Sequence, residues 1–361
     1  MENVPLAVPL DDLGALRARG PDAVAFLQGQ LSNDVAKLSA NRALLAGYHN
    51  PQGRVIALLR LVQLGPDDVL ALLPRELAPL VAPRLSKFVL RAKVKIADDS
   101  AAWRITGLVS AGAQGAGAAG VVGPAGVVGA AGTVGAAGTV GAAGTVGAAG
   151  GVGGTRVVVP VDAARSLLIT PATDAATPQH ANGARAWRRL DIAAGLPQVY
   201  ASTSEEFVAQ MLNLDVLGAI AFDKGCYTGQ EVIARAHYRG RVKRRLQRFV
   251  TRRAEGPSAH SGATQDDSVR VAWPAAFAPG ASGQLTDGRP FKVVDSVQLA
   301  DGRVEFLAVA PARAGEADDT AADRHAAAPD AADRHAAASD ATADAARVDA
   351  EQLPLPYALP E

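Results

Sequence analysis

The sequence predicts an α+β protein with several domains. The chain has 361 residues, 48% of them hydrophobic, which is enough to bury two or three separate cores. Helical and hairpin patterns alternate in the N-terminal part, whereas the residues beyond Gly240 show short strands and turns. The 36 basic and 36 acidic residues balance, so a nucleic acid or a membrane surface would have to be recognised by a local patch.

Each predicted element follows from a local pattern. Residues 16–38 contain apolar positions spaced for an amphipathic helix, with Asp22 as its expected cap. The turn-rich segment from Asn50 to Gly53 indicates a hairpin. Turns at Asp287-Gly288 and Asp301-Gly302 indicate further hairpins in a small β-barrel or sandwich. The other expected elements are strands at 43–48, 55–63 and 92–96 and a helix with two prolines at 77–88.

Two low-complexity segments divide the chain. Residues 111–154 form a Gly/Ala tract in which Gly-Ala-Ala-Gly-Thr-Val recurs. Ordering glycine costs much entropy and alanine buries little surface, so we expect a flexible insertion, with a collagen-like or β-roll structure as the alternative. The second segment, 313–352, is rich in Ala and Asp and is expected to be a disordered tether.

These segments predict the domain organisation. The expected parts are an N-terminal α/β lobe at 1–110, the insertion at 111–154, a second α/β lobe at 155–239, a β-barrel at 240–312, the tether at 313–352, and an apolar, proline-rich tail at 353–361 that docks onto the body. One cysteine and the lack of an apolar signal segment predict a cytoplasmic protein. No membrane span is expected, because the Gly/Ala tract has side chains too small to insert in lipid.

The segment Lys224-Gly225-Cys226-Tyr227-Thr228-Gly229-Gln230-Glu231 is the most informative motif. Thr228 and Glu231 have the spacing of a capping box, which places Cys226 just before a helix N-terminus. Backbone N–H groups there and the ammonium group of Lys224 would favour the thiolate, so Cys226 and Lys224 are the candidate catalytic residues. The alternative is a buried, inert cysteine that acts as a small core hydrophobe.

A dense basic run follows the motif. Arg239, Arg241, Lys243 and Arg244 form a candidate surface for RNA or an acidic partner, with a solvated surface without function as the alternative. Only Tyr238 and Phe249 are expected to offer aromatic surface in the run, which gives little support to base stacking. A metal site is not expected, because the histidines are scattered and one cysteine cannot hold an iron–sulfur cluster.

The motif and several other segments together resemble the YgfZ family of folate-binding proteins, relatives of the glycine-cleavage T protein. The resemblance covers nearly all of the chain outside the two low-complexity segments. The other segments that carry it are Phe26 to Leu31 with Asn33-Asp34-Val35, Gly53-Arg54, Trp187 with Ala194 to Pro197, and Leu355-Pro356-Tyr357.

The resemblance implies a T-protein-like ring, in which α/β lobes surround a central hole and a small C-terminal β-barrel closes the ring. It also implies tetrahydrofolate as cofactor, support of iron–sulfur proteins, and tRNA modification with a tRNA thiomethylating enzyme as partner, with a candidate tRNA contact. The folate site implied by the family includes Trp187, Gln230, Glu231 and Leu13, which stands where some members carry a tryptophan. Core packing is the alternative role of Trp187. Gly225, Tyr227 and Gly229 complete the motif.

One departure from the T protein argues against aminomethyl transfer. The T protein has an acidic pair after its hairpin turn, but Ala57-Leu58 stands at that place here. Without an acid or base there, proton transfer to the folate nitrogen has no evident provider. We therefore expect a folate-binding accessory protein rather than an enzyme, with a folate-dependent one-carbon transferase and an RNA-binding adaptor as the alternatives.

Overall fold

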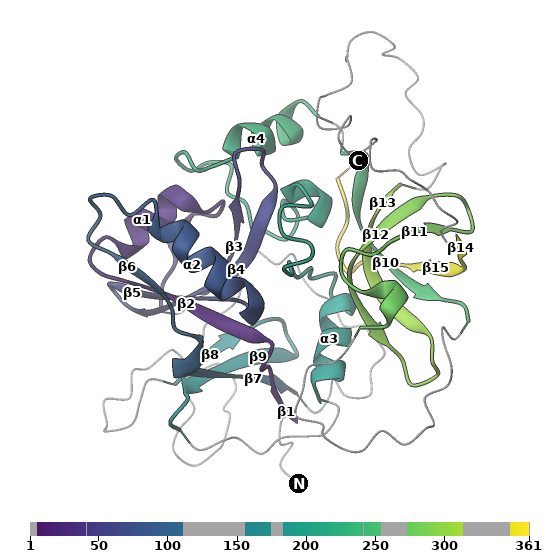
Figure 1. Ribbon diagram of the computed structural model, residues 1–361, viewed down its shortest axis with the longest axis horizontal. Helices are drawn as coiled ribbons and strands as arrows, with labels where there is room; N and C mark the ends of the chain where they lie inside the picture. Colours follow the sequence, from purple (N-terminus) through teal and green to yellow (C-terminus); the bar gives the residue numbers. More distant parts are fainter. Residues whose placement is uncertain are drawn as a thin grey trace.

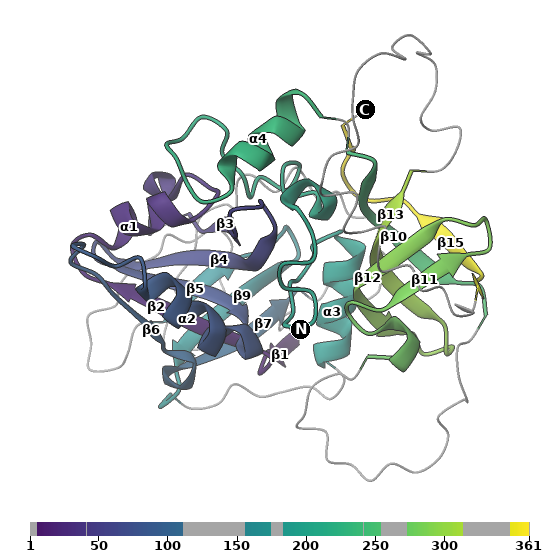
Figure 2. The same ribbon diagram turned by 45° about the horizontal axis from the view of Figure 1, so that its top comes forward.

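The computed structural model describes residues 6–40, 42–110, 156–174, 183–240, 242–253, 273–312 and 347–360. The Gly/Ala insertion, Arg241 and residues 313–346 of the predicted tether lie outside these ranges. Three sheets and a few helices make up the described part, and this confirms the α+β class. Figures 1 and 2 show helix α3 (Gly183–Ala193) between the N-terminal sheets and the C-terminal barrel.

The first sheet is antiparallel, in the order β3-β4-β5-β2-β6. It confirms the predicted hairpin and the short strand, although the latter begins at Lys95 instead of Ala92. The first helix forms but is short, and Asp22 does not cap it: its carboxylate accepts a hydrogen bond from the backbone N–H of Lys93 instead (2.6 Å). The elements are β2 (Leu13–Arg19), α1 (Ala23–Gln30), β3 (Leu44–His49), β4 (Val55–Gly65), β5 (Asp68–Pro74), α2 (Ala78–Ser86) and β6 (Lys95–Asp98).

The second sheet joins the two predicted lobes into one unit. Its order is β1-β7-β9-β8, so strands from before and after the insertion pair with one another, with Ile105 opposite Ile169. The predicted boundary between lobes 1–110 and 155–239 is therefore wrong, because the buried faces of these apolar strands form one core. The strands are β1 (Leu6–Pro9), β7 (Trp103–Val109), β8 (Val157–Pro160) and β9 (Arg165–Pro171).

The third sheet is a nearly closed barrel in the order β14-β11-β12-β13-β10-β15. Its core contains a cluster of phenylalanines. Gly288 and Gly302, with φ of +86° and +80°, make the two predicted hairpin turns. The strands are β10 (Arg244–Thr251), β11 (Ser282–Leu285), β12 (Pro290–Gln298), β13 (Val304–Pro311), β14 (Arg347–Val348) and β15 (Ala350–Leu353).

Strands β14 and β15 correct the predicted end of the tether. Residues 347–352 were expected to be disordered, yet they form strands, and β15 pairs with β10 with Arg248 opposite Leu353. The pairing is favourable because β10 would otherwise leave one edge with unpaired backbone groups. The barrel therefore extends beyond residues 240–312.

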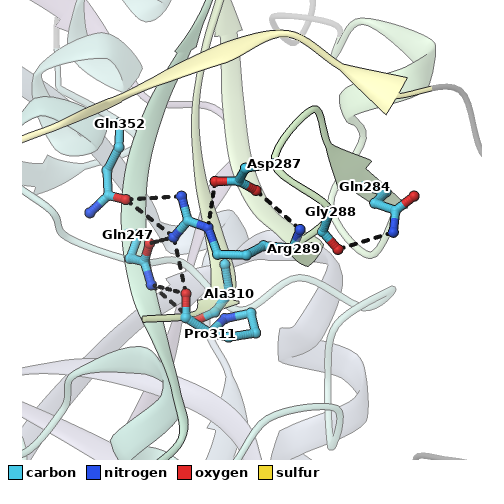
Figure 3. A network of polar contacts seen from close by, with 8 residues as sticks. All are labelled: Gln247, Gln284, Asp287, Gly288, Arg289, Ala310, Pro311 and Gln352. Carbon is cyan, nitrogen blue, oxygen red and sulfur yellow. Dashed lines mark hydrogen bonds and ion pairs between the residues drawn. The ribbon is translucent and has the colours of Figure 1, made fainter. Parts of the chain in front are cut away.

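Arg289 ties the start of β12 to the C-terminal segment (Figure 3). Its guanidinium group donates to the side-chain oxygens of Gln247 (3.2 Å) and Gln352 (3.3 Å), and Nε to Asp287 (2.8 Å). Beyond β15, the Tyr357 hydroxyl donates to the backbone oxygen of Gly195 (2.8 Å). The C-terminal segment thus connects the barrel to the residues after α3.

Candidate functional site

The motif runs into helix α4 (Gln230–Tyr238), whose first two residues are its last two, and it lies against the turn between β3 and β4. Gly229 begins the helix with φ of +82°, and a Cβ atom there would lie 2.5 Å from the backbone oxygen of Asn50. Only glycine fits this contact. The predicted capping box is wrong, because Gly229 takes the cap position and no side chain caps the helix.

Lys224 is held by backbone carbonyl groups at the end of α1. Its Nζ donates to the oxygens of Gln28 (2.6 Å) and Leu31 (2.6 Å), and to that of Asn33 (2.8 Å). Such carbonyl groups have no donor within the helix, and a cation near them is favourable. Burial lowers the pKa of Lys224 to about 8, against the opposing charge of Asp34. Lys224 therefore fixes the motif to α1.

Cys226 is exposed, in contrast to the buried cysteine considered as the alternative. Gly225 is exposed as well, and a Cβ atom on it would meet nothing within 4 Å. Tyr227, on the other side, is buried, and burial raises the pKa of its hydroxyl to about 12. The thiol thus stands on an open surface between two anchored side chains.

His49 lies beneath the motif and was missed by the sequence analysis. Its ring centroid is 6.2 Å from that of Tyr227. The side chain is buried, and neither ring nitrogen has a hydrogen-bond partner among the described residues. Burial lowers the pKa of His49 to about 3, so the ring is neutral at physiological pH. Its position between the predicted strand at 43–48 and the turn that begins at Asn50 was the one sequence signal that could have indicated His49.

Trp187 and Leu13 pack in one hydrophobic cluster. Trp187 is 6% exposed, the Arg165 guanidinium carbon lies 5.0 Å from its ring centroid, and a Cβ atom on Gly107 would lie 2.5 Å from the ring. The ring is therefore covered by its neighbours in this conformation. Folate stacking on Trp187 stays a prediction that requires neighbouring side chains to move.

The predicted folate residues do not line a single site. Gln230, half-buried, and Glu231, exposed, are the last two residues of the motif and lie in the first turn of α4. Helix α3, which carries Trp187, lies apart from α4 in both views (Figures 1 and 2). The structure thus groups Gln230 and Glu231 with Cys226, and Leu13 with Trp187.

A polar cluster adjoins the second group, where α3 meets β12. Arg188 is buried and lies 3.7 Å from the Asp12 carboxylate, 3.9 Å from Asp295 and 4.8 Å from the ring centroid of Trp273. Asp295 accepts hydrogen bonds from the Tyr200 hydroxyl (2.9 Å) and the Trp273 indole (3.0 Å). Burial raises the pKa of Asp295, which Arg188 opposes. Sequence reasoning missed this cluster, whose members come from distant segments.

The basic run is divided between paired and exposed cations. Arg245 pairs with Asp215 (3.0 Å), whereas Arg239, Lys243 and Arg244 are exposed. Phe249, predicted as aromatic surface, is fully buried in the barrel core, because alternate β10 side chains face inward. That part of the prediction is wrong.

Other features limit the chemistry of the described part. Ala57 and Leu58, at the place of the T protein's acidic pair, are both buried in β4. Within the described ranges no group of three or more His, Cys, Asp or Glu side chains is placed to hold a metal ion. None of the helices described is long and apolar enough to cross a membrane.

Fold and site together define an α+β protein with a C-terminal barrel and an anchored loop that presents one exposed thiol. The tRNA-modifying protein YgfZ of Edwardsiella ictaluri is 33% identical to it over 246 residues, which cover 68% of this chain and 71% of that protein. The protein of the same name from Pectobacterium carotovorum subsp. carotovorum is 32% identical over 255 residues, covering 71% and 73%. The chain belongs to the YgfZ family.

Two further comparisons concern protein-family models and solved structures. No family model matches the chain. The glycine cleavage system aminomethyltransferase T from Bartonella henselae superposes with a TM-score of 0.48 and 12% identity, over 86% of this chain and 79% of that structure.

Proposed function

We propose that this chain is a folate-binding accessory protein that acts in tRNA modification and supports iron–sulfur proteins through tetrahydrofolate and Cys226. Support for the tRNA role comes from the relatives, which are named tRNA-modifying proteins. The folate and iron–sulfur parts follow from the family resemblance of the motif. An accessory role rather than catalytic turnover is favoured by the buried aliphatic pair Ala57-Leu58.

The exposure of Cys226 between fixed neighbours is the observation that carries this proposal. Lys224 binds three carbonyl oxygens and Gly229 fits against the hairpin turn, so the loop needs little ordering when a partner approaches. A thiol on such a loop is accessible to a macromolecular partner. Lys224 acts as a positioning residue, because its ammonium group is bound by carbonyl oxygens in the last turn of α1 and just after it.

The polar cluster at α3 has the chemistry that tetrahydrofolate requires. Asp12 offers a half-buried carboxylate for the amino-pyrimidine edge and Trp273 a half-buried ring for stacking, and Arg188 lies between them, 3.7 Å from the carboxylate and 4.8 Å from the ring centroid. Two of the three adjoin a predicted folate residue in sequence, since Asp12 precedes Leu13 and Arg188 follows Trp187. Trp273 contacts Arg188. Bound tetrahydrofolate would supply one-carbon chemistry, while Gln230 and Glu231 lie apart from this cluster, in the first turn of α4.

The three tryptophans of the chain allow a direct test of folate binding. Trp273→Phe should weaken the affinity for 5-formyltetrahydrofolate, measured by calorimetry, about fivefold, because the ring loses part of its stacking surface. Trp187→Phe should weaken it less, since that ring is largely covered. Trp103→Phe, also in the core, is the matched control and should leave the affinity unchanged. Equal affinities in all three variants would contradict this assignment.

Cys226→Ser tests the thiol separately. Serine is similar in size and the site is exposed, so the free energy of unfolding should change by less than about 1 kcal/mol. The variant should nevertheless fail to restore iron–sulfur enzyme activity in cells that lack the protein.

Lys224→Met is the comparison for a positioning role. Three carbonyl oxygens lose their donor, so this variant should unfold more easily by about 2 kcal/mol. For the Cys226→Ser test, two results together would refute the role of Cys226. They are full rescue of iron–sulfur enzyme activity by the serine variant, and alkylation of the wild-type thiol no faster than that of a cysteine peptide.

A further inference from the structure

We propose that an unpaired base of single-stranded RNA binds beside the motif, in a pocket next to the rings of Phe222, His237 and Tyr238. The inference rests on the proposed function in tRNA modification and adds the chemistry by which the RNA is bound.

The three rings form an exposed aromatic cluster. Phe222 stacks on His237 with centroids 3.8 Å apart and an interplanar angle of 16°. Tyr238 stands edge-on to His237, at 4.7 Å and 80°, and its side chain is 68% exposed. Its ring is thus supported from one side and open on the other. Aromatic side chains of this kind accept unstacked bases in single-stranded nucleic acid complexes.

The pocket beside the rings has a volume of about 580 Å³, within the usual range for small-ligand sites. Ile220, Phe222 and Tyr238 contribute apolar surface to it. Lys37 contacts the carboxylates of Asp34 (3.1 Å) and Asp223 (3.6 Å), so its charge is largely balanced locally. The apolar and aromatic wall suits the face of a base, and the exposed Asp223, which lines the pocket together with Arg42, can accept from an exocyclic amino group.

Cations for the RNA backbone lie close to Tyr238 in the chain. Arg235 and Arg239 at the end of α4, with Lys243 and Arg244 after it, are exposed, and none of them makes an ion pair within the described part of the chain. By contrast, Arg245 and Arg248 further along are paired with Asp215 and Glu305. Arg235, Arg239, Lys243 and Arg244 thus offer positive charge close to Tyr238 in the chain, which a phosphate-binding surface requires.

Single-stranded RNA fits this surface better than duplex RNA does. In a duplex the bases are paired and stacked, so Tyr238 cannot reach a base face. A loop or an end presents unstacked bases together with the phosphates that the cations need.

Fluorescence anisotropy with a labelled 12-nucleotide RNA, single-stranded or annealed to its complement, tests the inference on the full chain. Tyr238→Ala should weaken binding of the single strand about fivefold or more. Phe88→Ala is the matched control, since this aromatic residue is 52% exposed after α2, and it should have no effect. Arg239→Gln should lower the slope of log affinity against log salt by about 0.7, and Arg91→Gln, another exposed arginine, should leave it unchanged.

Two results would overturn the site. One is single-strand affinity unchanged by Tyr238→Ala, and the other is a duplex that binds as tightly as the single strand. Calorimetry with 5-formyltetrahydrofolate separates this outcome from failure of the proposed function. Tyr238→Ala should retain folate affinity, whereas a wild-type chain that binds the RNA but no folate would refute the folate proposal alone.

Discussion

Lys224 has a structural role, although its charge near Cys226 suggested a catalytic one. Its ammonium group closes the carbonyl end of α1, 196 residues before it in the chain at Gln28. Although burial lowers its pKa to about 8, the protonated form still prevails at neutral pH, and this form has the three N–H donors that the three oxygens need. Cys226, two residues away, is consequently held in place without being covered.

His49 predicts a pH dependence of stability. The unfolded chain binds a proton on this ring near pH 6.5, whereas the folded chain does so only near pH 3. Between these values the unfolded state binds more protons, so the free energy of unfolding falls as the pH falls. In urea unfolding at pH 7, 6 and 5, wild type should lose about 1.4 kcal/mol per pH unit more than His49→Leu below pH 6.

Tyr227→Phe is the control for this measurement. It alters the ring that packs against His49 but keeps the imidazole, so the wild-type pH slope should persist even at lower stability. A His49→Leu slope equal to that of wild type would mean that the imidazole is protonated alike in the folded and unfolded chain.

At the scale of elements, the sequence correctly predicted the helices and hairpins that depend on local sequence signals. The hairpin of β3 and β4, the helix with Pro79 and Pro83, and the barrel hairpin at Asp301-Gly302 all depend on turn residues or on short-range periodicity. The motif loop was located for the same reason, since its glycines and its helix are adjacent in sequence.

The features that the sequence did not predict depend on contacts between distant segments. Strand β15 exists because the edge of β10 is available, and residues 350–352 alone read as part of an Ala/Asp segment. The aromatic cluster was missed because Phe222 lies before the motif and His237 and Tyr238 after it. The acceptors of Lys224 and the cluster around Arg188 could not be predicted either, because their members are far apart in the sequence.

At the scale of the whole molecule, shared sheets and a returning C-terminal segment hold the parts together. The second sheet spans both predicted lobes, and α3 contacts both β1 and β12. Tyr357 closes the connection, because its hydroxyl group bonds to Gly195 and also accepts from Asn213 Nδ2 (3.3 Å). The fold therefore does not rely on the Gly/Ala segment to position β7 and β8, since both strands pair with β9.

That arrangement predicts that residues 111–155 can be replaced by a linker of about ten Gly and Ser residues. Val109 lies opposite Arg165 and Val157 opposite Ile169, so the two strand ends differ by four residues along β9 and lie on either side of it. The gap is about 13 Å along the strands and about 10 Å across them, close to the roughly 17 Å mean span of such a linker. Because a shorter loop costs less entropy to close, the free energy of unfolding in urea should stay equal or rise by about 1 kcal/mol. An equally long Gly/Ser replacement of the same segment is the control for length. A loss of more than about 2 kcal/mol in both variants would show that residues 111–155 contribute contacts to the folded protein.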